Sequence, residues 1–225
     1  MLPVIRFIMV QSTLNARFFE STRGRIVDLL RRSSHTVDEL ASELDITDNA
    51  VRLHLGMLER DGVVRSRGVR REGAVGKPAT MYEIAPDADP LFSNAYLPFL
   101  STLLAALADR MSVRELRALM RDVGQRLAGD AKPSDGNLQA RAELASRVLN
   151  ELGGLTTVET VESGARMAIR GCGCPLSVAV CDRPEVCVAV QTMLAELTGA
   201  QVREQCDRSG DRPQCCFELT TKTSS

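Results

Sequence analysis

The sequence has no tryptophan, two histidines and only 4% aromatic residues. Proteins that read single-stranded RNA or DNA stack the bases on aromatic rings, so this scarcity argues against that class. No hydrophobic run approaches the roughly 18 to 20 residues that a membrane span needs. Residues 1–10 are apolar but lack the basic start and the small-residue cleavage site of a signal peptide. We therefore expect a cytoplasmic protein with no membrane partner.

An excess of charge of one sign is also lacking, because 28 basic and 29 acidic residues leave a formal net charge of −1. A nucleic-acid partner would require the positive charge to be concentrated locally. Of the 225 residues, 44% are hydrophobic and 25% are charged, as in ordinary globular proteins. This length and composition predict one large domain or two small ones and exclude a wholly disordered chain.

The N-terminal third has the spacing of three helices followed by two short strands. Helices are predicted over residues 22–32, 36–44 and 47–61, and strands over 63–69 and 80–84. Thr36 and Glu39 have the spacing of a capping box at the start of the second helix. In the third helix Val51, Leu55 and Leu58 recur on one face, so we expect them in the core.

Two helices, a tight turn, a third helix and a hairpin follow one another in the order of a winged helix-turn-helix. The segment TVDELASELDITDNAVRLHLGMLERDGVV, followed by GKPATMYEI, resembles the N-terminal domain of ArsR- and DeoR-like bacterial repressors over residues 22–85. Residues 60–79 hold six basic and two acidic side chains, so positive charge is concentrated in the hairpin. The resemblance implies a double-stranded DNA operator as partner, and reading two half-sites requires a homodimer.

The face of the third helix opposite the core and the basic hairpin carry the candidate DNA contacts. Asn49 has the chemistry to pair with adenine, Arg52 with guanine or a phosphate, and Leu53 with a thymine methyl group. Thr47 can contact phosphate besides capping its helix. The cations of the hairpin are expected at phosphates or in the minor groove: Arg65, Arg67, Arg70, Arg71 and Lys77.

Beyond residue 88 the pattern is helical up to residue 153 and then changes toward the two-residue period of strands. The helices can form core or a dimer contact, and we favour the dimer contact. The last third predicts a hairpin, a helix and two more strands: 156–162, 166–170, 184–198, 202–205 and 215–220. The fold class is therefore α+β in four parts: an N-terminal extension (1–21), a winged helix-turn-helix (22–88), a helical dimerisation or linker region (89–153) and a small cysteine-rich sensor domain (154–225).

All seven cysteines lie in the last third of the chain, between Cys172 and Cys216. In a reducing compartment, clustered cysteines indicate metal or redox chemistry more than disulfides. No pair has the C-x2-C spacing of a zinc ribbon, and both histidines lie in the N-terminal third. An all-thiolate site built from distant segments suits an iron–sulfur cluster at least as well as zinc.

Two segments, CPLSVAVCDRPEVC and CCFEL, resemble the C-terminal motifs of the repressors of the suf iron–sulfur assembly operon. With the winged helix, this resemblance covers nearly the whole chain. It implies an iron–sulfur cluster, of the 4Fe–4S or the 2Fe–2S type, that reports iron–sulfur supply or oxidative stress. Matching motif to motif implies Cys174, Cys187 and Cys215 as ligands, with Cys206 as the best fourth. The doublet leaves the choice between Cys215 and Cys216 open, and a solvent molecule or a small thiol stays open as the fourth ligand.

Three alternatives stay open for the C-terminal domain: a structural zinc site, a thiol switch without metal, and a pocket for a small hydrophobic effector. An enzyme is not expected, because a nucleophilic cysteine normally needs a basic partner such as histidine, and this region has none. The expected function is that of a dimeric regulator, a repressor of iron–sulfur assembly or stress genes. It would bind its operator tightly with the cluster and weakly without it.

Overall fold

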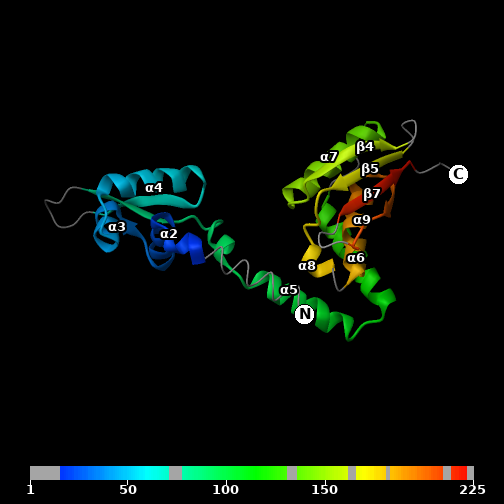
Figure 1. Cartoon of the computed structure of the whole chain (residues 1–225), viewed down its shortest axis with the longest axis horizontal. Coiled ribbons are helices and arrows are strands. Elements are labelled where there is room, and N and C mark those ends of the chain that lie inside the picture. The colour runs from blue at the N-terminus through cyan, green and yellow to red at the C-terminus, as the bar shows by residue number, and fades with distance from the viewer. Residues whose placement is uncertain are drawn as a thin grey trace. The chain divides into compact units, whose positions relative to one another are not determined.

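The structure, a computed structural model of the chain, describes residues 16–70, 78–130, 136–161, 166–180, 183–209 and 214–221. The chain divides into two compact units, Met1–Pro98 and Phe99–Ser225. Helices and strands occur in both (Figure 1), which confirms the expected α+β class. Among the described helices, none combines the length and the apolar character needed to cross a membrane.

The N-terminal unit contains three main helices and a three-stranded antiparallel sheet of order β1-β3-β2. Its elements are α2 (Thr22–Arg32), β1 (His35–Thr36), α3 (Val37–Leu44), α4 (Asp48–Arg60), β2 (Val64–Arg70), β3 (Ala79–Ile84) and the 3-10 helix η1 (Asp89–Phe92). The three predicted helices and the hairpin are confirmed. The short strand β1, which pairs with β3, is not among the predicted elements.

Capping explains where two of these helices begin. Thr36 Oγ1 accepts a hydrogen bond from the Glu39 backbone N–H at 3.3 Å, and the Glu39 carboxylate accepts one from the Thr36 N–H at 2.7 Å. The predicted capping box is therefore confirmed. Thr47 caps α4 by accepting from the Ala50 N–H at 3.3 Å. Gly68, with a φ of 129°, lies at a bulge where the register of β2 shifts.

One hydrophobic core joins the helices of this unit to its sheet. Val51, Leu55 and Leu58 of α4 are buried in it, as predicted. Phe18 and Phe19, from a helical stretch over residues 16–20, pack against the same core. The expected boundary between an extension and the winged helix at residues 21 and 22 therefore lies inside the unit, because these two rings cover part of its apolar interior.

The C-terminal unit contains a four-stranded antiparallel sheet of order β4-β5-β7-β6 with helices packed on it. Its helices are α5 (Tyr96–Ala108), which begins at the junction with the first unit, α6 (Val113–Ala128), α7 (Leu138–Glu151), α8 (Ser177–Val180), η2 (Pro184–Val186) and α9 (Cys187–Thr198). Its strands are β4 (Thr156–Val161), β5 (Arg166–Gly171), β6 (Gln201–Glu204) and β7 (Cys215–Thr220). The predicted hairpin, helix and two late strands are confirmed.

Helices α7 and α9 cover one face of this sheet (Figure 1) and contact each other. Ile169 of β5 and Phe217 and Leu219 of β7 point into the core between the layers. Helix α6 packs against α9. The sequence analysis separated residues 89–153 from 154–225, but α6 and α7 share their core with the sheet, so residues from 99 onward form one unit. A sheet with one apolar face needs helices to cover it, and α7 and α9 supply the cover.

At Gly124, α6 lies in close contact with α9. A Cβ atom added there would lie 2.7 Å from Thr192 Cβ and would also overlap the carbonyl oxygen of Ala189. Since the overlap involves the backbone of α9, a flexible side chain cannot relieve it. Glycine is therefore required at this position, and α6 cannot move along α9 without losing the close contact.

We expect Gly124→Ala to destabilise the C-terminal unit by about 1–2 kcal/mol. Overpacking of this kind costs about 1–3 kcal/mol, and removing a helical glycine returns up to about 1 kcal/mol. The control is Gly56→Ala in α4, where an added Cβ meets nothing within 4 Å, so that variant should gain up to about 1 kcal/mol. Calorimetric melting of each variant measures both changes. An unchanged melting temperature for Gly124→Ala would contradict the close packing.

Candidate nucleic-acid interface and cysteine site

The exposed face of α4 carries the side chains that the sequence analysis assigned to DNA. Asn49, Arg52 and Leu53 are all exposed, and Leu53 is 64% exposed although it is apolar. Arg52 has no hydrogen bond or ion pair with any described residue. Thr47 accepts a hydrogen bond as the cap of α4, and its hydroxyl proton stays available for a second partner. These four side chains thus form one exposed surface at and near the N-terminus of α4.

The arginines of the hairpin, in contrast, are paired with carboxylates. Arg65 donates to Glu83 Oε1 from Nε at 2.9 Å and from Nη2 at 2.7 Å, and Arg67 Nη1 donates to Glu83 Oε2 at 3.1 Å. The hydrogen bond from Arg65, followed by the charge of Arg67, holds the pKa of Glu83 below its usual value. Glu83 lies opposite Arg65 in the register of β2 and β3, so the pairing follows from the hairpin itself.

Arg70 forms an ion pair with Glu39, the carboxylate of the α3 capping box. The hydrogen bond from Arg70, together with that from Thr36, lowers the pKa of Glu39 to about 2. One carboxylate therefore caps α3 and fixes the end of β2 against it. The two remaining hairpin candidates, Arg71 and Lys77, lie outside the described residues.

In the C-terminal unit, the four candidate cysteine ligands come together from four separate segments. Cys174 follows β5, Cys187 begins α9, Cys206 follows β6 and Cys215 begins β7. Cys206 is hydrogen-bonded to both Cys187 and Cys215, and Cys215 also contacts Cys174. These four thiols, the thiol cluster below, lie against the core over the sheet and against a second core that α6 shares with the start of α9.

Strand geometry separates the two cysteines of the doublet. Successive side chains of a strand point to opposite faces, and Cys215 shares the helix-covered face with Phe217 and Leu219. Cys216 lies opposite Arg170 of β5 in the register; burial raises the pKa of Cys216, and the charge of Arg170 offsets part of that rise. Cys215 therefore belongs to the thiol cluster and Cys216 to the other face.

The four cysteines of the thiol cluster shift one another's pKa values in opposite directions. Donation from Cys187 and Cys215 lowers the pKa of Cys206 far below its usual value, and donation from Cys215 lowers the pKa of Cys174 to about 7. The pKa of Cys187 is raised by its donation to Cys206 and by burial. The pKa of Cys215 is raised by its donation to Cys174 and Cys206 and by burial. Cysteines with lowered pKa values thus lie beside cysteines with raised ones, and all four would lose their protons to a soft metal on binding it.

No group of three or more His, Cys, Asp or Glu side chains within the described ranges is spaced to hold a metal ion. The four thiols contact one another instead. Their chemistry still fits an iron–sulfur cluster, because the donor set is all sulfur, is partly shielded from water and comes from four segments. The described cysteines are all free thiols. Cys172 is exposed and outside the thiol cluster, and Cys181 lies outside the described residues.

A comparison with family models and solved structures bears on the N-terminal unit. A model described as a helix-turn-helix domain matches residues 20–67. A comparison with curated proteins finds no match. Reduced HlyU from Vibrio cholerae is 23% identical over 37% of this chain and 87% of that one, with a TM-score of 0.26. The homodimeric winged helix-turn-helix DNA-binding domain of Mb0332 from Mycobacterium bovis is 23% identical over 46% of this chain and 85% of that one, with a TM-score of 0.27. The adhesin competence repressor of Streptococcus pyogenes is 19% identical over 51% of this chain and 86% of that one, with a TM-score of 0.28.

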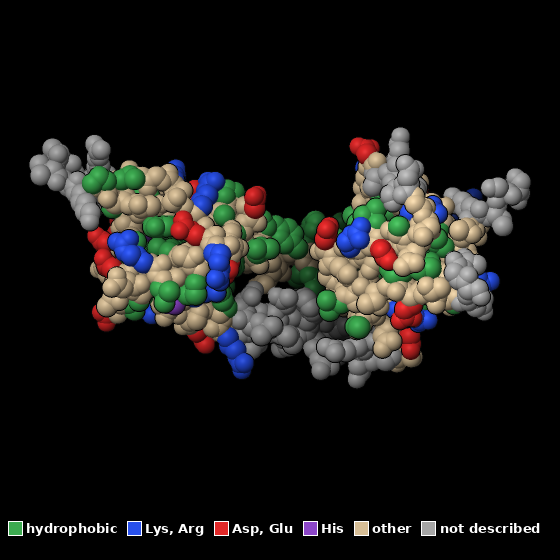
Figure 2. All heavy atoms as spheres, turned by 90° about the horizontal axis from the view of Figure 1, so that it is seen from above, with side chains coloured by type: hydrophobic (Ala, Val, Ile, Leu, Met, Phe, Trp, Pro, Cys, Tyr) green, Lys and Arg blue, Asp and Glu red, His purple; other side chains and the backbone are tan. Residues whose placement is uncertain are grey.

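The N-terminal unit is a winged helix-turn-helix. Transcription regulators bind DNA with this fold and insert its recognition helix into the major groove. In this winged helix-turn-helix the recognition helix is α4, and β2 and β3 form the wing. Figure 2 shows arginine side chains on the surface of this unit with carboxylates among them, in keeping with the pairs on the wing.

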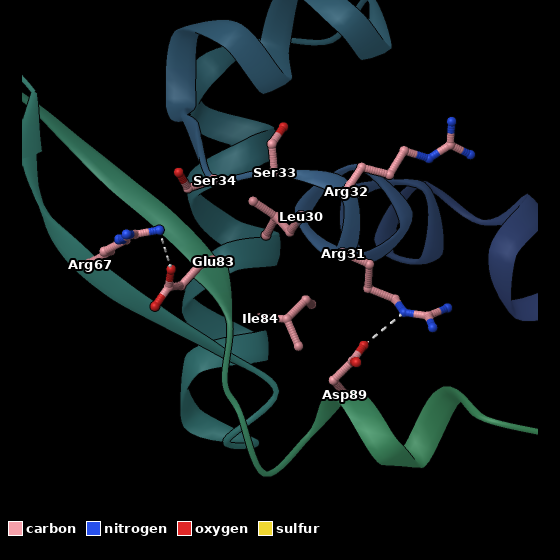
Figure 3. A pocket seen from close by; sticks show the side chains of 9 residues that line it. All are labelled: Leu30, Arg31, Arg32, Ser33, Ser34, Arg67, Glu83, Ile84 and Asp89. Atoms are coloured by element: carbon pink, nitrogen blue, oxygen red, sulfur yellow. Dashed lines mark hydrogen bonds and ion pairs between the residues drawn. The ribbon is translucent and has the colours of Figure 1, made fainter.

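A pocket of about 250 Å³ lies on the winged helix-turn-helix, between the end of α2, β3 and η1 (Figure 3). Two arginine–carboxylate pairs line it, Arg67 with Glu83 and Arg31 with Asp89, the second at 3.1 Å. The guanidinium of Arg31 also lies 5.2 Å from the centre of the Phe92 ring. Both carboxylates of the lining are therefore paired, and the third arginine of the lining, Arg32, pairs with Asp28 at 2.8 Å.

Sequence reasoning missed three residues of these sites, namely Glu39, Glu83 and Arg208. The capping role of Glu39 was predicted, but its pairing with the wing was not. Glu83 lies on β3, two residues after Met81. In the sequence, a carboxylate within a basic hairpin was the signal that could have predicted its pairing with the arginines. Arg208 lies two residues after Cys206, and its Nη2 donates to Cys187 Sγ at 3.2 Å.

The contrast between α4 and the wing gives a test by substitution. Arg52→Ala should cost about 1–3 kcal/mol at one base position and relax the preference there, because a bidentate contact to a base is lost. Arg67→Ala should weaken binding to all DNA sequences alike. It should also reduce by about 1 the slope of the logarithm of affinity against the logarithm of salt concentration. Fluorescence anisotropy with a selected site and its single-base variants measures both, and Arg117→Ala in α6 is the control. Equal weakening of all sequences by Arg52→Ala would make Arg52 a phosphate contact instead.

Proposed function

We propose that this chain is a homodimeric repressor that binds operator DNA through α4 and the wing and senses an iron–sulfur cluster bound by Cys174, Cys187, Cys206 and Cys215. One observation carries the proposal more than any other. Four thiols from four segments contact one another, and they are the four that the spacing and the resemblance to the suf repressors single out. Of the other described cysteines, Cys172 is exposed and the side chain of Cys216 lies on the other face of β7.

A bound cluster supplies one-electron redox chemistry at these four sulfurs. The protein contributes the position of each sulfur. Cys187 is fixed as the first residue of α9, and Cys215 by its pairing with Gly171 in β5. The Cys216 N–H donates to Cys206 Sγ at 3.3 Å, which fixes the third sulfur. Such hydrogen bonds to ligand sulfurs orient them and tune the bound group.

Helix α5 has the surface that the proposed dimer needs. It contains no charged residue, and Leu104 is its one buried residue. Tyr96, Phe99, Leu100 and Leu103 are 40 to 69% exposed, and Figure 2 shows hydrophobic side chains exposed along this stretch. An apolar stripe on a helix is stable in water only when another surface covers it. A second copy of α5 would cover this stripe with its own, so that both stripes are buried in one two-fold symmetric, isologous contact.

The thiol cluster and α5 are joined through one set of packed side chains. Cys187 and Val186 share a core with Leu104 of α5 and with Leu116 and Met120 of α6. A change in the position of Cys187 therefore acts on the helix that carries the exposed stripe. In the proposed mechanism, loss of the cluster changes this packing and with it the dimer. The two recognition helices then no longer meet both half-sites together, and operator affinity falls.

The dimer is tested by Leu100→Glu combined with Leu103→Glu. Two carboxylates in each stripe would bring like charges together in an apolar contact. We expect this variant to be a monomer, with dimer affinity lowered at least about 100-fold, roughly 2.7 kcal/mol. Sedimentation equilibrium measures the change. Leu127→Glu, at an exposed position of α6, is the control and should remain dimeric. A variant that stays dimeric would remove α5 from the interface.

The cluster is tested by iron, sulfide and the visible spectrum of protein purified without oxygen. We expect a brown protein that bleaches in air, with operator affinity higher before bleaching than after it at the same salt concentration. Cys187→Ser should lose the iron and the regulation but keep non-specific DNA binding. Cys172→Ser, an exposed cysteine outside the thiol cluster, is the matched control and should behave as the parent protein.

The same measurement identifies the alternatives. A colourless protein with one zinc per chain would indicate a structural site, for which four thiolates also suffice. A protein that stays metal-free after attempted reconstitution would point to a thiol switch or an organic effector. Equal operator affinity with and without iron would contradict the sensor part of the proposal and leave the DNA-binding part intact.

A further inference from the structure

We propose that Arg208 is the positioning cation of the thiol cluster. It would hold Cys187 Sγ in place and set the reduction potential of the group bound there, while Glu204 opposes its charge. This inference rests on the proposed iron–sulfur function, and it concerns residues that neither the motifs nor the comparisons assign to any role.

The backbone aims Arg208 at the thiol cluster. Along residues 202–208 exposed and partly buried side chains alternate, with Val202, Glu204, Cys206 and Arg208 all on the partly buried face. Asp207 pairs with Gln214 in an antiparallel bridge, so the chain stays extended past the end of β6. Alternation along an extended chain places Arg208 on the same face as Cys206.

The hydrogen bonds of the guanidinium fix it between a sulfur and a carboxylate. Its Nη2 donates to Cys187 Sγ at 3.2 Å and to Glu204 Oε1 at 2.5 Å. The Nε atom of Arg208 is buried and has no hydrogen-bond partner among the described residues. A buried donor without an acceptor is costly, and a bound group carrying sulfide or thiolate would supply that acceptor.

The charges next to the thiol cluster determine how this arrangement affects the reduction potential. The charge of Arg208 acts on Cys174 and on Cys187, whereas that of Arg170 acts on Cys216 at the other face. A cluster held by four thiolates would leave a net negative charge at a partly shielded site, and one-electron reduction would add one more. A nearby cation stabilises the reduced form and raises the potential, and a nearby carboxylate does the opposite.

Removing the charge of Arg208 and removing that of Glu204 should therefore shift the reduction potential in opposite directions. In reconstituted protein, Arg208→Gln should disfavour reduction at least about tenfold, about 59 mV lower for a one-electron couple. Glu204→Gln should shift the potential upward, because Arg208 then acts without its counter-charge. Arg208→Lys keeps the charge but not the planar fork of donors, so its potential should lie between those of the parent and Arg208→Gln. Arg203→Gln, which removes an exposed cation from the opposite face of β6, is the control and should leave the potential unchanged.

Spectroelectrochemical titration of each variant, after iron analysis, separates the outcomes. If the parent protein binds no cluster, the proposed function fails and not only this inference. If the parent binds one and Arg208→Gln titrates like Arg203→Gln, the inference is overturned while the sensor stands. Should Arg208→Gln take up too little iron to titrate, Arg208→Lys decides instead. A potential below that of the parent supports the role of Arg208, and one equal to that of Arg203→Gln overturns it.

Discussion

Helix α9 is packed on two sides, and the rest of the C-terminal unit depends on this double contact. Met193, Leu194 and Leu197 face the core over the sheet, whereas Cys187 and Ala189 face the core shared with α5 and α6. A helix that is apolar on nearly all sides has to be enclosed by protein, and the close approach at Gly124 holds α6 against it. Because Cys187 is the first residue of α9, any shift of this helix also changes the spacing of the thiols.

In the winged helix-turn-helix, the number of arginines overstates the charge available to DNA. Glu83 neutralises part of the charge of Arg65 and Arg67, and Glu39 does the same for Arg70. A phosphate that approaches the wing therefore competes with a carboxylate that is already hydrogen-bonded. Arg52 on α4 has no such competitor among the described residues. The arrangement favours selective contacts from the recognition helix over indiscriminate attraction by the wing, in keeping with a chain whose net charge is −1.

Local patterns in the sequence were sufficient to predict nearly all helices and strands. Caps such as Thr36 and Thr47 and the spacing of Val51 and Leu55 are short-range signals, and the structure follows them. Packing between distant segments was not predictable in the same way. The period of α6 shows an apolar face but not which surface covers it, so the merger of the helical region with the cysteine-rich region was missed. The choice of Cys215 over Cys216 needed the pleat and partners of β7, since both are buried.

The exposed stripe of α5 and the core that contains Cys187 lie on neighbouring faces of the same helix. Leu104 points into the core that contains Cys187, and its neighbour Leu103 is 43% exposed. A helix transmits a rotation or a shift from one side to the other because its backbone hydrogen bonds keep it rigid. A displacement at Leu104 is therefore also a displacement of the surface proposed to contact the second copy. Sensing and dimerisation would share one element, and no contact between the sensor and the DNA-binding unit is needed to connect them.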